Sequence, residues 1–193
     1  MNHEILVEGA RLILKGLGLD PDSEGIAKTP ERVACMFEEL ASCIDTDPGS
    51  VVDVMFKESY DELVMVRDIS FVSLCEHHLL PFFGRAHVGY LPNVDGHVTG
   101  LSKLARVVDT VARRPGLQER MTNCVADTLL QSLNPRGVVV VVEAEHTCMT
   151  FRGISKPGAM TVTSAMRGLM RTDTNTRAEV LSLINSGRAT RLV

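Results

Sequence analysis

The chain has 193 residues, 45% of them hydrophobic and 23% charged, which is enough to bury a core in a domain of ordinary size. Its formal net charge of −4 argues against a general nucleic-acid-binding surface, and the absence of Trp removes one of the usual base-stacking side chains. No apolar run is long enough to cross a bilayer and charges interrupt the N-terminal apolar residues, so we expect a cytosolic protein.

The N-terminal part predicts two helices. Residues 4–17 have apolar side chains spaced among charges, as in a helix that packs on a surface. A second helix is expected to begin with Thr29 as its N-cap and Pro30 as its first helical residue. Its predicted buried stripe consists of Val33, Met36, Phe37 and Leu40.

Residues 44–62 contain a turn sequence and several acids, and they predict a loop or an edge segment. We therefore expect an N-terminal helical region over 1–62 and a main domain over 63–193. The domain should contain two hairpins around a helix pair, then a final helix and a frayed polar tail. The predicted elements are strands over 63–74 and 84–91, helices over 102–114 and 117–133, strands over 138–148 and 160–172, and a helix over 174–184.

This order predicts an α+β fold in which an antiparallel four-stranded sheet has helices on one face. A four-stranded sheet leaves two edge strands whose backbone groups need partners. We therefore expect copies of the chain to associate edge to edge.

Two clusters of metal-binding side chains lie at predicted strand ends. Cys75 and His78 have the C-x-x-H spacing that lets two side chains of one turn reach one ion. His146 and Cys148 are two residues apart, so on a continuous strand they would project to the same side. Five widely spaced cysteines in a chain expected to be cytosolic favour ligands over disulfides.

These four residues leave two kinds of zinc site open. A closed site would use all four and stabilise a non-catalytic oligomeric scaffold, whereas a catalytic site would use three and keep a position for water. The additional imidazoles of His77 and His146 favour catalysis, because a pKa near neutral suits proton transfer.

A further group of side chains predicts an anion site. Ser102, Lys103 and Arg106 lie on the first turns of a predicted helix, whose N-terminus favours anions. Arg152 adds a planar guanidinium that suits phosphate. For Lys103 or Arg106 alone, a solvated basic face is the simpler interpretation.

Gln118 and Glu119 open the next predicted helix. A carboxylate in the first turn stabilises a helix through its dipole, which is the simplest role for Glu119. The same carboxylate can accept two N–H bonds from a guanine-like edge.

Several long segments together resemble GTP cyclohydrolase I, over most of the chain from 29 to 184. They span 73–84, 100–106, 114–120, 145–148, 152–153 and 161–164. The resemblance implies the tunnelling fold, in which four-stranded sheets join into a barrel, and a homodecamer of two pentamers with active sites between subunits. It implies opening of the guanine imidazole ring of GTP, loss of C8 as formate, and closure to 7,8-dihydroneopterin triphosphate, the first step of pterin and folate biosynthesis.

The resemblance also implies a role for each candidate residue. Cys75, His78 and Cys148 match the zinc ligands, His146 matches the principal acid/base, and His77 matches the second imidazole. The residues that match substrate contacts are Gln118 and Glu119 for guanine, Ser102, Lys103, Arg106 and Arg152 for the triphosphate, and Arg32 from a neighbouring subunit. A different pterin or deazapurine enzyme of the same fold is the nearer alternative, but the paired cysteines with Glu119 favour the opening of GTP.

Overall fold

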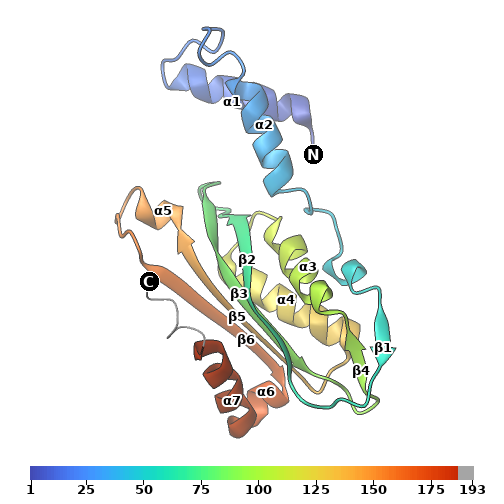
Figure 1. Cartoon of the computed structure of the whole chain (residues 1–193). Coiled ribbons are helices and arrows are strands. Elements are labelled where there is room, and N and C mark those ends of the chain that lie inside the picture. Colours follow the sequence, from blue (N-terminus) through green and yellow to red (C-terminus); the bar gives the residue numbers. More distant parts are fainter. Residues whose placement is uncertain (187–193) are drawn as a thin grey trace.

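The main body of the computed structural model, which describes residues 1–186, is built on an antiparallel four-stranded sheet with strand order β2-β3-β5-β6 (Figure 1). This architecture confirms the predicted α+β class and the predicted order of the two hairpins around a helix pair. Its strands are β2 (Val64–Leu74), β3 (Pro81–Leu91), β5 (Gly137–His146) and β6 (Met160–Gly168).

The helices α3 (Leu101–Ala112) and α4 (Gln118–Leu133) cover one face of this sheet. Side chains of a strand alternate between its faces, so Val138, Val140 and Val142 of β5 pack against α3 and α4. Val139 and Val141 pack on the opposite face.

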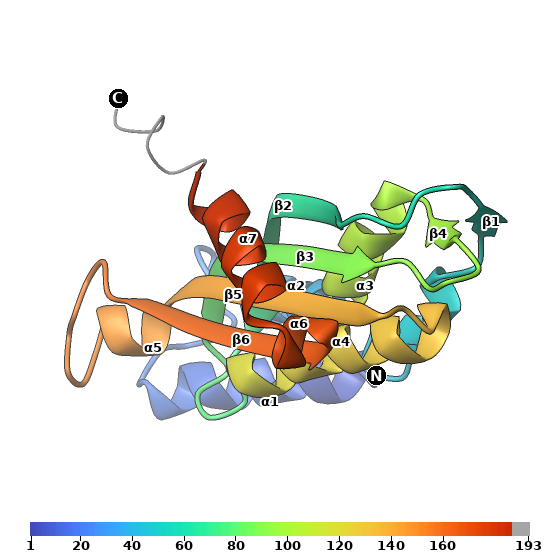
Figure 2. The ribbon, with the colours of Figure 1, turned by 90° about the horizontal axis from the view of Figure 1, so that it is seen from below.

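The C-terminal helices α6 (Leu169–Thr172) and α7 (Thr174–Asn185) contribute to that opposite face through Met170, Val180 and Ile184 (Figures 1 and 2). The predicted face for the helix pair is confirmed for α3 and α4, and the C-terminal helix, for which the sequence predicted no position, packs on the other face. The predicted frayed tail lies mostly outside the described residues. None of the described helices has the length and apolar character needed to span a membrane.

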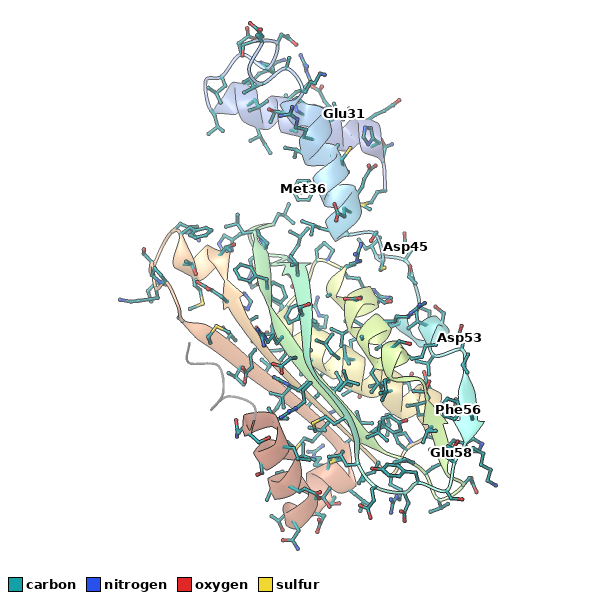
Figure 3. The ribbon with its side chains drawn as sticks, in the orientation of Figure 1. Glu31, Met36, Asp45, Asp53, Phe56 and Glu58 are labelled. Carbon is teal, nitrogen blue, oxygen red and sulfur yellow. The ribbon has the colours of Figure 1, made fainter. Side chains whose placement is uncertain are left out.

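The N-terminal helices α1 (His3–Gly16) and α2 (Thr29–Leu40) pack on each other beyond one end of the sheet (Figure 1). Lys28, rather than Thr29, occupies the N-cap of α2, and its side chain makes no capping bond. Ala34 is fully buried, whereas Met36 is 43% exposed, which corrects the predicted stripe (Figure 3). The stripe differs because α2 packs mainly on α1 and hardly on the sheet.

The segment expected to be a loop or an edge does contain an edge strand. A 3-10 turn, η1 (Pro48–Val51), leads into β1 (Met55–Lys57), which pairs antiparallel with β4 (His97–Thr99). The sequence pattern did not predict β4, which follows the turn at 92–96. Together β1 and β4 form a small second sheet beside the N-terminal end of α3 (Figure 1).

Candidate active site

The turn from Cys75 to Leu80, here called the ligand turn, folds back tightly after β2. The Cys75 N–H donates to the Leu80 carbonyl at 2.9 Å, and the Leu79 N–H donates to the Cys75 carbonyl at 2.8 Å. Leu79 has a φ of 53°, a left-handed conformation that helps to close the turn. His78 is thereby held close to Cys75.

Cys148 reaches the ligand turn by a route that the sequence did not predict. Strand β5 ends at His146, and residues Thr147–Thr150 form a single helical turn, α5. The Thr147 hydroxyl donates to the Pro81 carbonyl at 2.6 Å, which fastens this turn to β3. The prediction of a strand through Cys148 is therefore wrong, and so is the reason given for His146 and Cys148 projecting together.

Cys75, His78 and Cys148 form a group of side chains that could hold a metal ion, here called the metal group. One ligand atom from each lies within 4.8 Å of the other two. Tetrahedral zinc with ordinary bond lengths needs ligand atoms about 3.5–3.8 Å apart, so a small contraction suffices. Among the described residues His146 does not belong to this group.

The electrostatics of the metal group fit a cation. Burial, and then the neighbouring Cys75 thiol, raise the pKa of Cys148. Two thiols that disfavour each other's ionisation become good ligands when a cation stabilises both thiolates. All five cysteines are free. Two sulfurs and one imidazole are ligands that bind zinc well, whereas calcium and magnesium bind mainly to oxygen ligands.

Arg152 and His77 lie at the exposed edge of the metal group. The Arg152 Nη1 atom donates to His78 Nε2 at 2.8 Å, so this guanidinium is the predicted phosphate contact that lies closest to the metal group. His77 is exposed, and its ring centroid lies 6.3 Å from that of His78.

His146 is held beside the metal group by two contacts. It is paired in register with Phe82 of β3, and the two rings stack with centroids 4.5 Å apart and planes 3° from parallel. Its Nε2 atom lies 2.8 Å from the Gln118 Oε1 atom. Burial lowers the pKa of His146, with the Glu119 charge acting in the opposite direction, so the ring is neutral near neutral pH.

The first turn of α4 is tied to the ligand turn. The Gly116 N–H donates to the Leu74 carbonyl at 2.9 Å, so the chain enters α4 alongside the ligand turn. The Arg120 guanidinium then binds the Glu76 carboxylate with two bonds of 2.7 and 3.3 Å. The sequence pattern did not predict this ion pair, although its members flank predicted site residues.

Gln118 and Glu119 are neighbours with opposite surroundings. Glu119 is exposed, so its carboxylate is open to a ligand. Gln118 is 1% exposed, and its side-chain amide binds within the protein. The geometry therefore separates two residues that the sequence grouped together.

The predicted anion site lies at the other end of α3. This helix has 12 residues, so Leu101 lies about 18 Å from the end of the helix that is next to the ligand turn. Gly100 is the N-cap, and Ser102 does not cap the helix. Lys103 forms an ion pair with Asp53, on the segment before β1 (Figure 3).

Arg32 is exposed on α2, a helix that packs mainly on α1 and makes few contacts with the sheet. The described chain thus brings together Cys75, His78, Cys148, Arg152, His146, His77, Gln118 and Glu119, but not Ser102, Lys103, Arg106 or Arg32.

Known proteins match this chain over almost its whole length. The family model for GTP cyclohydrolase I matches residues 6–185. GTP cyclohydrolase 1 of Bacillus pumilus is 55% identical over 186 residues, which cover 96% of this chain and 98% of that protein. GTP cyclohydrolase 1 of Halalkalibacterium halodurans is 57% identical over 184 residues, which cover 95% of this chain and 97% of that protein.

Among solved structures, the apo form of archaeosine synthase QueF-Like matches 55% of this chain and 93% of that chain, with a TM-score of 0.43 and 21% sequence identity. The sequence relatives and the family model decide the assignment, because they extend over nearly the full length. The chain belongs to the GTP cyclohydrolase I family.

Proposed function

We propose that this protein hydrolyses GTP at C8 of the guanine ring, releases formate, and closes the product to 7,8-dihydroneopterin triphosphate. The observation that carries the proposal is a three-residue metal group beside a neutral, fixed histidine that is not part of the group. Three ligands with a nearby proton acceptor are the arrangement of a hydrolytic metal site. Membership of the family and the names of its relatives supply the substrate.

The metal would be zinc, held by Cys75, His78 and Cys148. When bound, it would supply a Lewis acid that makes water nucleophilic near neutral pH. The protein's own part is to place a proton acceptor, and His146 suits this role because its ring is neutral and its orientation is fixed. The exposed His77 is the candidate for a second proton transfer during the later rearrangement.

Binding of the substrate would orient C8 toward the metal group. The open carboxylate of Glu119 would accept N–H bonds from the guanine edge, while Arg152 would bind an anionic oxygen near the metal group. Fixing both ends of the nucleotide converts binding energy into alignment of the reacting atom.

A complete site would need a second copy of the chain. Ser102 and Lys103 lie about 14–15 Å, and Arg106 about 9 Å, from the end of α3 that is next to the ligand turn, and they would contact the triphosphate from a neighbouring subunit. Arg32 would likewise reach the site of a neighbour. The proposed assembly is the homodecamer of two pentamers in which sheets join into a barrel. Its support is that β2 and β6 are edge strands in the described chain.

Incubation of the zinc-loaded protein with GTP tests the activity. We expect formate and, after oxidation, a fluorescent pterin in equal amounts. His146→Ala should keep its zinc and lose turnover by at least about 10³-fold. Absence of product from wild-type protein would refute the proposed reaction, and loss of zinc from His146→Ala would make His146 a ligand.

Mixing two defective variants tests the shared site. His146→Ala would be inactive, and Lys103→Met would turn over slowly at GTP concentrations well below its raised KM. After dissociation and reassembly together, roughly a quarter of the sites should combine intact halves from two subunits. Mixed oligomers without recovered activity would show that each chain forms its site alone.

A further inference from the structure

The side chain of Gln118 is buried against β5 and β6, where it is 1% exposed. Its Nε2 atom lies 3.0 Å from the Val142 carbonyl oxygen, 3.1 Å from the Thr161 carbonyl oxygen and 3.0 Å from the Thr163 hydroxyl. A side chain so enclosed cannot reach the edge of a base in the substrate. Gln118 therefore acts through its contacts with other residues of the protein.

The surroundings determine which way the amide faces. Carbonyl oxygens only accept hydrogen bonds, so the group that faces Val142 and Thr161 must be the NH₂. The flipped amide would place its oxygen against two other oxygens. The Oε1 atom consequently points to His146.

A relay of two threonines fixes the same orientation. The Thr122 hydroxyl lies 2.7 Å from the backbone carbonyl of Gln118, to which it can only donate. The Thr163 hydroxyl, 2.7 Å from that of Thr122, must then donate to it and accept from Gln118 Nε2. Each hydroxyl hydrogen therefore points to one acceptor, and the donor and acceptor of every bond in the network are fixed.

The consequence reaches the imidazole of His146. Since Gln118 Oε1 only accepts, the His146 Nε2 atom 2.8 Å away must carry the hydrogen. The Nδ1 atom of the neutral ring then has a free lone pair, and it has no hydrogen-bond partner within residues 1–186. Stacking on Phe82 fixes the plane of the ring.

We propose that Gln118 is a positioning residue that holds His146 in the tautomer protonated at Nε2, so that Nδ1 presents the free lone pair of the ring. Thr163 and Thr122 act through Gln118 by preventing the amide from flipping. An O–H group that donates to Nδ1 leaves the Nε2–H bond to Gln118 unchanged, so the ring keeps its orientation. The catalytic consequence rests on the proposed function, whereas the tautomer does not.

Solid-state ¹⁵N NMR of zinc-loaded, histidine-labelled protein tests the tautomer without turnover. His146→Gln identifies the His146 signals by their disappearance. We expect a protonated Nε2 and a bare Nδ1 in the wild type, and a loss of this single tautomer in Gln118→Leu. A wild-type signal from a protonated Nδ1 would overturn the proposal, whether or not the protein opens GTP.

Kinetics test the consequence for the reaction. Gln118→Leu should lower kcat by roughly 10²-fold with little change in the KM for GTP. Thr163→Val, which removes only the hydroxyl of the relay, should lower kcat by about 10-fold, and Thr163→Ser should restore it. A raised KM with unchanged kcat in either of the first two variants would show instead that this network serves substrate binding.

Thr128→Val is the matched control, since Thr128 is a buried threonine of the same helix that lies outside the network. It should leave both kinetic constants near those of the wild type. If Gln118→Leu does not fold, the wild-type NMR spectrum still decides the tautomer, and Thr163→Val, which keeps the two carbonyl contacts of Gln118, tests the relay alone. Unchanged kcat in folded Thr163→Val, together with an unchanged tautomer, would remove the relay from the proposal.

Discussion

The ligand turn, α5 and the start of α4 bind one another at one end of the main sheet, while Lys103 at the other end of α3 has an exposed acid as its partner. At the first end the contacts run through backbone pairing, a stacked ring and a buried amide. At the second end Lys103 is paired with Asp53, whose side chain is 60% exposed. Under the proposed function, the first end would hold the groups for proton transfer in fixed positions, whereas at the second end Lys103 would exchange the Asp53 carboxylate for a phosphate of the substrate.

The largest expected effect comes from breaking the metal group. Cys148→Ala should lose zinc and turnover together, because two remaining ligands hold the ion weakly. The fold should persist, since the main core packs β2, β3, β5 and β6 against α3 and α4 without needing an ion. Zinc stoichiometry and circular dichroism check both parts.

Chelation of the wild-type protein provides the complementary control. A catalytic site should lose activity and regain it when zinc is restored, while the circular dichroism spectrum stays constant. Unfolding on chelation would instead favour the structural, scaffold-like site.

At the opposite end, removing the cation should affect binding rather than chemistry. Lys103→Met should raise the KM for GTP by roughly 10- to 100-fold, the cost of losing one charge-assisted phosphate contact. Zinc content should not change. A loss of kcat at unchanged KM would place Lys103 in the chemistry and abolish the distinction between the two ends.

Asp53→Asn tests the same end in the opposite direction. Lys103 holds the pKa of the Asp53 carboxyl below its ordinary value, so Asp53 is ionised near neutral pH and, under the proposed function, would compete with phosphate for Lys103. Removing this exposed charge should lower the KM for GTP by about 2- to 5-fold. An increase in KM would mean that Asp53 orients Lys103 for the substrate.

A moderate effect is expected from the tie between the ligand turn and α4. Glu76→Gln should weaken zinc binding by roughly 3- to 10-fold, because the pair with Arg120 steadies a turn that carries two ligands but is partly exposed. Zinc affinity, measured by competition with a chelator, gives the value. Arg120→Gln should behave alike, and the double variant should add little more if the pair acts as a unit.

The smallest effect concerns the N-terminal helices. His3 binds Glu38 and Glu31 at 3.0 Å each, and these hydrogen bonds raise the pKa of His3. Because the pKa is raised on folding, these bonds stabilise the packing of α1 on α2 fully at pH values below the pKa of His3 in the unfolded chain, about 6.5. The stabilisation disappears as the pH rises through the higher pKa of His3 in the folded protein.

Hydrogen exchange of the α1 amides, corrected for the intrinsic rate, should therefore show protection that declines as the pH is raised above the pKa of His3 in the unfolded chain. His3→Gln should remove this pH dependence. A dependence that persists in His3→Gln would have another source.

Much of the architecture follows from local pattern. The β-branched run before Val142, the helix stripes and the turn residues predict the order of strands and the helix pair. The C-x-x-H spacing and the position of Cys148 predict the metal group. These features depend on side chains that lie near one another in sequence or at the ends of predictable strands.

Other features follow only from long-range contacts. The strand ends at His146 because the Thr147 hydroxyl donates to a carbonyl of β3, and this bond cannot be predicted from local propensity. Lys28 and Gly100, rather than Thr29 and Ser102, precede α2 and α3.

The role of Gln118 shows the division most clearly. Its sequence position beside Glu119 predicts a shared task, and only the packing of α4 on β5 and β6 turns its amide toward His146. The sequence by itself determined which chemical groups this protein has and, through the spacing of apolar residues in each segment, where most of its helices and strands form. The tertiary structure decided which polar atoms face each other, because that depends on the register of strands far apart in the chain.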